Sequence, residues 1–454
     1  MVNPTFFVKP IITYLKPMQT IAPQPVQQPA NKTSQLFPVI LVTSLFFLWG
    51  FAHNLDPILI PHLKRSFTLT TVQATLIDSA VFAAYFLMAI PAGIIMKKYG
   101  YKWGIVIGLL IFATGSFLFI PAANTQLYSF FLIALFIIAC GLTILETAAN
   151  PYMSTLGDPK TSVLRLNFAQ SFNGLAAAMA PAIGARIILT KGHTDAELST
   201  MTEAAKKLAL AAEAASVKTP YFILGAILVV IAILFSIIKL PKIQKTEEHV
   251  AGKNILHAFK HKHLSWGVAA QFFYVGAQVC VFSLFILYAT KSAGISEVKA
   301  ADYLGICGIA FLIGRFVGTA LNVVIQPQKL LALYAIINIA LCLVAVFAHG
   351  MITVYTVIGI CFFMSIMFPT IFSLGIKGLG GDTEFGSSLI IMSIVGGAIL
   401  PRFFGMVGES FNNIQYGYIV PLICFAVIAV FGLSGYKVTS KTDVQTAFDP
   451  GNLG

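Results

Sequence analysis

The residues at 141–151 have the types and spacing that could carry chemistry inside a membrane. This stretch reads GLTILETAANP and places the carboxyl group of Glu146 in an apolar run that begins near Leu127. Asn150 follows one helical turn later, and the helix-breaking Pro151 comes directly after it. An ionisable side chain at membrane depth is costly, so it usually faces a cavity and works there. We therefore predict a functional Glu146, with structural pairing to a neighbouring helix as the alternative.

Amide and phenol groups recur at helical spacing in two further stretches. Asn167 and Gln170 share one stretch, and Gln271, Tyr274 and Gln278 share the other, so each set lies on one face of its helix. Amides both donate and accept hydrogen bonds, and beside an aromatic ring they suit a neutral polyol better than an ion. Amides also hold membrane helices together, which is the alternative. Because each half of the chain contributes one set, we predict that both sets bind substrate.

Four more ionisable residues fall in or beside apolar runs. Asp56 precedes Pro57, so a kink there could bring its carboxyl group to the cavity. Asp78 lies early in the next apolar run, where it could equally be solvated at the external interface. We expect Arg315 and Arg402 to extend toward the interface or to pair with helix ends rather than to touch substrate.

The class of protein that holds these residues follows from the composition. The chain is 57% hydrophobic and 10% charged, which is typical of a polytopic membrane protein and far too apolar for a soluble one. The six cysteines stand singly in apolar runs, with no CxxC pair and no histidine partner at metal spacing. We therefore expect no disulfide, metal site or cofactor. The net charge of +12 is spread over loops, which argues against nucleic acid as a partner.

Apolar runs recur at intervals of about 30 residues, and each is long enough to cross a bilayer as a helix. This pattern predicts an all-α polytopic protein with twelve transmembrane helices. They are expected at 36–62, 72–96, 103–123, 127–155, 163–190, 219–240, 264–290, 299–325, 329–349, 351–376, 386–408 and 416–436. An alanine-rich amphipathic helix is also expected in the longest external loop, at 190–218.

An even number of helices places both termini on one side of the membrane. Basic residues gather in the loops of that side, with Lys97, Lys98 and Lys102 in one loop and Lys160 and Arg165 in another. Loops rich in Lys and Arg face the cytoplasm, so we predict that both termini are cytoplasmic.

Composition also divides the chain into parts. We predict a disordered cytoplasmic tail at 1–35, a six-helix half at 36–240, a cytoplasmic linker at 241–262, a second six-helix half at 263–437 and a cytoplasmic tail at 438–454. The first tail is rich in Pro, Gln and Thr, lacks the pattern of a signal peptide, and contains Met18 as a second plausible start. Proline and glycine fall at matching places in the two halves, which indicates a duplicated, pseudo-symmetric unit.

Four motifs resemble those of one family. They are LETAANP at 145–151, RLNFAQSFN at 165–173, AQFFYVGAQ at 270–278 and PTIFSLGIK at 369–377. Together they closely resemble the L-fucose:proton symporter and glucose/galactose transporter family of the major facilitator superfamily, from about Phe46 to the twelfth predicted helix. The resemblance implies a major facilitator fold and inward transport of a monosaccharide with protons, across the inner (plasma) membrane of a bacterium.

The resemblance also implies roles for single residues. The family's fourth-helix glutamate, which handles protons and sugar, falls on Glu146, and the motif at 165–173 adds Asn173 to the predicted substrate-binding residues. The first helix departs from the family's Asn-Asp-Ile-Leu pattern, because Pro57 stands at the aspartate position and Asp56 one residue earlier. Such a shift rotates a side chain by about 100° on a helix. Asp56 is kept as the second candidate for proton coupling.

Several functions were weighed on these grounds. In a symporter the two halves rock around a midplane site, and burial would favour the protonated Glu146 until water entered from inside. A proton-independent sugar facilitator is the main alternative. A membrane enzyme would need a nucleophile or metal constellation, and a receptor would need a signalling domain, and neither is found in the sequence. We expect a monomer in the lipid bilayer, with the choice of sugar set by site geometry that linear spacing does not reveal.

Overall fold

The computed structural model describes residues 32–54, 67, 71–125, 127–156, 158–188, 200–238, 240 and 255–438. These residues form helices joined by short turns, and no strand occurs in the part described. The predictions for both tails fall outside it apart from 32–35 and 438, as do those for Asp56 and Pro57 and for most of the linker.

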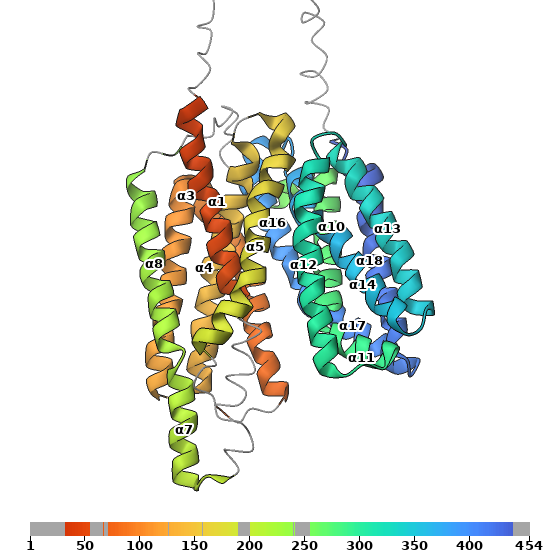
Figure 1. The fold of residues 1–454 in the computed structure, drawn as a ribbon. Coiled ribbons are helices and arrows are strands. Elements are labelled where there is room, and N and C mark those ends of the chain that lie inside the picture. The colour runs from red at the N-terminus through yellow and green to blue at the C-terminus, as the bar shows by residue number, and fades with distance from the viewer. Residues whose placement is uncertain are drawn as a thin grey trace, which may run out of the picture.

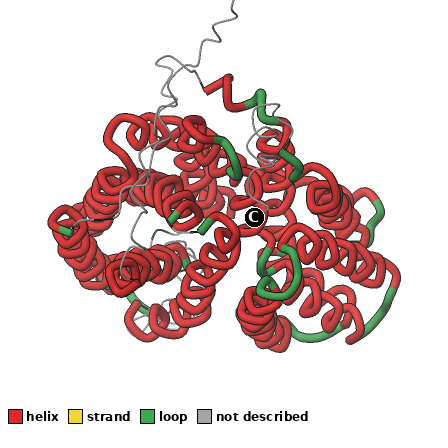
Figure 2. The backbone as a smooth tube through the Cα atoms, turned by 90° about the horizontal axis from the view of Figure 1, so that it is seen from above, coloured by secondary structure: helices red, strands yellow, loops and turns green. Residues whose placement is uncertain are grey.

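The helices gather in two groups that lie side by side, as Figures 1 and 2 show from two directions. The first half contains α1 (Lys32–His53), α3 (Thr71–Thr125), α4 (Tyr128–Thr155), η1 (Pro159–Thr161), α5 (Ser162–Ile188), α7 (Glu203–Ala215) and α8 (Lys218–Ile237).

The second half is preceded by the short helix α9 (Ile255–Ala258). It contains α10 (Lys262–Ser283), α11 (Phe285–Ala293), α12 (Glu297–Leu321), α13 (Pro327–Phe347), α14 (Met351–Met364), α15 (Met367–Gly375), η2 (Gly380–Asp382), α16 (Thr383–Met392), η3 (Ser393–Val395), α17 (Gly396–Ser410), η4 (Ile414–Tyr418), α18 (Ile419–Val430) and η5 (Phe431–Gly435).

Nine helical segments of the described chain are long and apolar enough to cross a membrane. One of them, Ser79–Thr125, is two rods joined at Gly100, whose φ of 80° is a conformation that glycine adopts without strain. Because that segment counts as two helices, the nine segments supply ten. The helices α1 and α5 lie outside those nine and supply the other two of the predicted twelve. The kink at Gly100 falls in the basic turn that was expected between the second and third helices. A helix is also present in the stretch 190–218, where an amphipathic helix was predicted, as α7.

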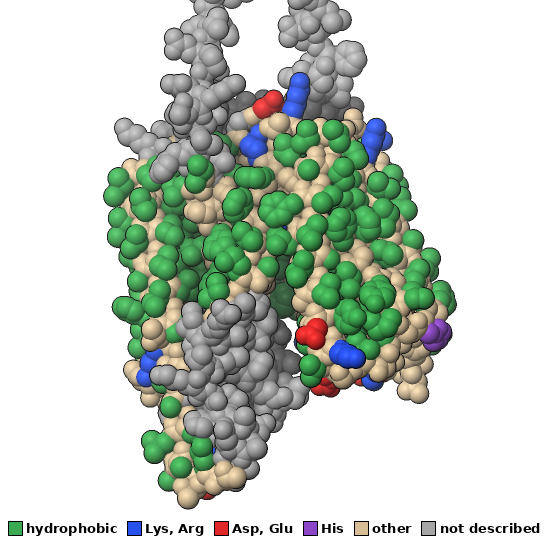
Figure 3. Space-filling model, in the orientation of Figure 1, with side chains coloured by type: hydrophobic (Ala, Val, Ile, Leu, Met, Phe, Trp, Pro, Cys, Tyr) green, Lys and Arg blue, Asp and Glu red, His purple; other side chains and the backbone are tan. Residues whose placement is uncertain are grey.

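On the face seen in Figure 3, apolar side chains form a broad band, and charged side chains lie above and below that band. In α8 only 33% of the most apolar 18-residue stretch is buried within the protein. Leu, Ile, Val and Phe side chains of this helix therefore point outward, where lipid tails can solvate them. Helix termini and loops meet water at the two edges of the band.

We call the face on which α1 begins the terminal face; it is uppermost in Figure 1. The two halves are joined close to this face. Among the described residues, the hydrogen bonds that link them include Ser162 Oγ with Ser373 Oγ (2.8 Å), Asn167 Nδ2 with Thr370 Oγ1 (3.2 Å), and a guanidinium nitrogen of Arg315 with the carbonyl oxygen of Gln170 (2.7 Å). Each of these bonds involves one residue of the stretch 162–170, which is about 12 Å long and begins α5.

Glycine allows a further close contact between the halves near the terminal face. A Cβ atom on Gly93 of α3 would overlap the hydroxyl oxygen of Ser388 on α16. A larger residue at position 93 would therefore require the Ser388 side chain to move. These contacts describe a bundle whose halves are closed together on the terminal face.

Candidate functional site

Glu146 lies on α4 beside α3. Its Oε1 atom accepts a hydrogen bond of 2.6 Å from the hydroxyl group of Tyr85, which is 3% exposed. Gly141 brings the two helices together, since a Cβ atom there would lie 2.5 Å from the backbone nitrogen of Phe112. The half-buried carboxyl group of Glu146 is thus held by one donor, with its second oxygen available for another partner.

Asn150 lies on the same face of α4, one turn beyond Glu146. Its Oδ1 accepts a hydrogen bond of 3.1 Å from Nε2 of Gln170 on α5. Asn150 is fully buried, and its Nδ2 has no hydrogen-bond partner within the described residues. The Nδ2 of Asn150 can therefore donate a hydrogen bond to a ligand or to water.

The other two amides of α5 make contacts between helices. Asn167 donates to the carbonyl oxygen of Val163 (3.0 Å) as well as to Thr370, so it joins the halves, while its Oδ1 lacks a partner in the part described. Asn173 is half-buried and packs closely against α1, where a Cβ atom on Gly50 would lie 2.8 Å from the Nδ2 of Asn173. Helix packing accounts for much of what these two amides do here.

The predicted stripe on α10 is buried and unpaired. Gln271 and Tyr274 are both 0% exposed. Neither the Nε2 nor the Oε1 of Gln271, nor the hydroxyl of Tyr274, has a hydrogen-bond partner in the described chain. Each such group costs about 1–3 kcal/mol unless water or a ligand pairs with it. Gln278, on the same face, is half-buried.

Aromatic and cationic groups lie near this stripe. The ring of Phe368 on α15 packs edge-on against Tyr274, with 6.2 Å between ring centroids. Arg315 is 4% exposed, and its Nε donates to the carbonyl oxygen of Ser365, the C-cap of α14. Arg315 thus pairs with a helix end, which is one of the two expected alternatives, and it also donates to the carbonyl oxygen of Gln170 across the halves. Arg402 is exposed on α17.

Tyr85, Thr370 and the cross-half bond of Arg315 were not predicted to contribute to the site. Tyr85 is 61 residues from Glu146, Thr370 is 203 residues from Asn167, and Arg315 is 145 residues from Gln170. No spacing pattern in the sequence connects residues so far apart. The side chain of Asp78 is outside the described part. All six cysteines are buried, and each is free in the structure.

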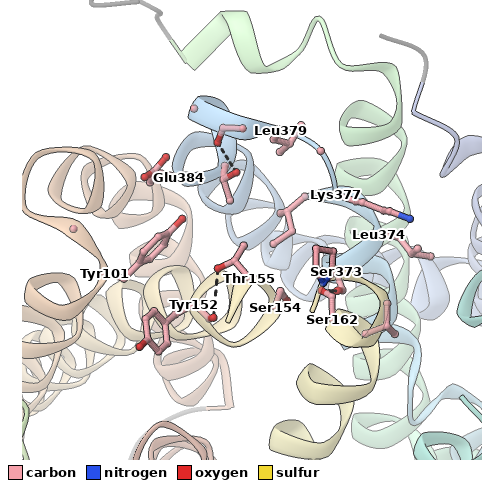
Figure 4. A pocket seen from close by; sticks show the side chains of 18 of the residues that line it. Tyr101, Tyr152, Ser154, Thr155, Ser162, Ser373, Leu374, Lys377, Leu379 and Glu384 are labelled. Atoms are coloured by element: carbon pink, nitrogen blue, oxygen red, sulfur yellow. Dashed lines mark hydrogen bonds between the residues drawn. The ribbon is translucent and has the colours of Figure 1, made fainter. Parts of the chain in front are cut away.

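A cavity of 1360 Å³ opens on the terminal face, between the loops of the two halves. Tyr101, Tyr152, Lys377 and Glu384 are among its lining residues, and Figure 4 shows them around the opening. The lining includes none of the residues predicted to bind substrate. Ser162 and Ser373, which are hydrogen-bonded to each other, line the same cavity. We take it as a vestibule, separated from the buried amides by the contacts that join the halves.

Known proteins resemble this chain over most of its length. The chain is 42% identical over 423 residues to the L-fucose-proton symporter of Escherichia coli (strain K12), covering 91% of this chain and 97% of that protein. It is 41% identical over 403 residues to the glucose/galactose transporter of Brucella abortus biovar 1 (strain 9-941), covering 88% and 94%.

Solved structures give the same result. The crystal structure of the transporter FucP in the outward conformation superposes with a TM-score of 0.84 at 42% identity, covering 89% of this chain and 100% of that one. The predicted all-α, multi-pass membrane fold of two six-helix halves is thereby confirmed. The model of the Major Facilitator Superfamily matches residues 40–395. This chain belongs to the Major Facilitator Superfamily.

Proposed function

We propose that this protein imports a monosaccharide of the fucose, glucose or galactose class together with protons, by alternating access. The names of its relatives support a sugar transporter rather than an enzyme. The observation that carries the proposal is the set of unpaired polar atoms on Gln271 and Tyr274. Sugar hydroxyls, which both donate and accept, are the partners that these atoms lack.

The proposed roles follow from the chemistry of each side chain. Glu146 would carry the coupled proton and accept a hydrogen bond from the sugar, and Asp56 is the second candidate for proton coupling. The remaining substrate-binding residues would be Asn150, Asn167, Gln170, Asn173, Gln271, Tyr274 and Gln278. Of these, Asn167 would mainly hold the two halves together on the terminal face, because it is hydrogen-bonded to Thr370.

The proposed cycle uses the contacts on the terminal face as a gate. With the halves joined there, sugar would enter from the opposite face and meet the buried amides. Parting of the bonds from Ser162, Asn167 and Arg315 would then connect the site to the 1360 Å³ vestibule and release sugar and proton. The halves would rock about the site, as in other transporters built from repeats.

We further propose that the terminal face is cytoplasmic, since Lys98, Lys102, Lys160 and Lys377 line its vestibule. In this orientation the chain would lie in a bacterial inner membrane as a monomer surrounded by lipid. The proposed parts are the half at 36–240, the linker at 241–262 and the half at 263–437, with cytoplasmic tails at 1–35 and 438–454.

The test is uptake of labelled monosaccharides into vesicles, with and without an imposed proton gradient. The proposal requires that at least one sugar of the class accumulates above its external concentration only when the gradient is present. Equilibration without accumulation would instead support a proton-independent facilitator, the alternative favoured by Pro57 at the family's aspartate position. No transport of any of these sugars would refute both.

A further inference from the structure

Two histidines and a buried carboxylate converge on the terminal face, away from the proposed sugar site. Asp382 Oδ2 lies 2.8 Å from His257 Nδ1 and 3.3 Å from His261 Nε2. One nitrogen from each ring and one carboxylate oxygen all lie within 4.8 Å of one another. The histidines come from α9 and the turn after it, and Asp382 ends η2 just before α16.

Backbone turns hold the three side chains in place. The amide of Lys260 donates to the carbonyl oxygen of His257 (3.0 Å), and that of His261 donates to Ala258 (3.1 Å), so both rings project from one tight turn. The amide of Asp382 donates to the carbonyl oxygen of Leu379 (3.0 Å). The arrangement therefore does not depend on flexible side chains alone.

The donor set fits a borderline transition-metal ion. Imidazole nitrogen and carboxylate oxygen bind Zn²⁺ at about 2.0–2.2 Å, so donors around a tetrahedral ion stand about 3.3 Å apart. Of the two distances to Asp382 Oδ2, the 3.3 Å to His261 Nε2 matches that spacing, and the 2.8 Å to His257 Nδ1 is shorter. The side chains of His257 and His261 are 29% and 19% exposed, which leaves a path for an ion and room for water as a fourth ligand.

The burial of Asp382 favours an ion over a simple hydrogen-bonded cluster. Asp382 is 2% exposed, and its Oδ1 has no hydrogen-bond partner in the described chain, which is costly for a buried carboxylate. A bound cation would compensate the charge of this group. The neighbouring His263 directs its Nε2 to the carbonyl oxygen of Lys377 (2.8 Å), so that nitrogen is engaged elsewhere.

We propose that His257, His261 and Asp382 form a Zn²⁺ site that fastens α9, at the end of the linker, to the turn before α16. The expectation of no metal site rested on cysteine spacing, and it overlooked that His257 and His261 stand four residues apart. Their third partner lies 121 residues beyond His261, which no local motif shows. The inference does not depend on sugar or proton transport.

The test measures Zn²⁺ binding to the purified full-length protein, freed of any histidine tag and stripped with a chelator. Competition with a chromophoric zinc indicator should give one more bound equivalent for the wild type than for His257→Ala or Asp382→Asn. Any residual binding at the site should be at least about tenfold weaker. His349→Ala is the matched control, because His349 is exposed on the opposite face and should bind as wild type.

A second readout uses Co²⁺ as a spectroscopic substitute. The wild type should show the visible absorption of a low-coordinate Co²⁺ site, and His257→Ala should abolish it. Because His257 is partly exposed, this variant should elute from size exclusion as wild type even if Asp382→Asn does not fold. Equal Zn²⁺ binding by the wild type and His257→Ala, or no binding by either, would overturn the proposal.

Discussion

Gln271→Met should stabilise the folded protein and weaken its binding of sugar. Methionine keeps the unbranched shape of glutamine and removes the two buried polar atoms that lack partners in the described residues. Relieving an unsatisfied buried amide should raise the free energy of unfolding by about 1–3 kcal/mol. Losing the hydrogen bonds that the amide makes to sugar should cost about 1–3 kcal/mol of binding, or about 5- to 150-fold in Kd.

Asn338→Leu provides the matched control. Asn338 on α13 is also 0% exposed, and both of its amide atoms lack partners in the described chain, but it is not among the proposed site residues. It should stabilise the protein by a similar amount and leave the Kd for sugar unchanged. Thermal unfolding in detergent and isothermal titration with the transported sugar measure the two quantities. Sugar binding by Gln271→Met equal to wild type would refute the role of this amide.

Two further predictions concern the gate and the orientation, both measured in a background without the native cysteines. Arg315→Lys keeps the charge but cannot bind both Ser365 and Gln170. Losing one of these hydrogen bonds should cost the closed arrangement about 1–3 kcal/mol, which should favour opening on the terminal face. Labelling from that face of Asn150→Cys, a position that is fully buried behind the gate, should then rise several-fold, and unchanged labelling would count against the gate. For the orientation, an impermeant reagent applied to intact cells should label Glu203→Cys and leave Lys98→Cys unlabelled, and the reverse pattern would contradict cytoplasmic termini.

The helices could be predicted because lipid imposes simple rules. Every spanning segment must be mainly apolar and helical, so twelve segments stand out in the sequence as recurring apolar runs. The same rules single out Glu146, since a carboxyl group stands out in an apolar run. The stripe of Gln271 and Tyr274 follows from helical periodicity, and both side chains are buried in the structure.

What could not be predicted depends on contacts between distant parts of the chain. Whether Asn167 faces a sugar or Thr370 is decided by the packing of α5 against α15, which no periodicity encodes. Helix breaks are equally hidden, since the predicted helix at 351–376 divides at Ser365 into α14 and α15. The carbonyl oxygen freed near that break is what Arg315 binds.

Glu146→Gln tests the central proposal most directly. Glutamine keeps the size of the side chain and an oxygen that can still accept the hydrogen bond from Tyr85, but it carries no titratable proton. We predict that sugar counterflow, which needs no net proton movement, persists in vesicles containing this variant, while accumulation under a proton gradient is lost. Accumulation as steep as that of wild type would contradict the account and move proton coupling to Asp56 or elsewhere.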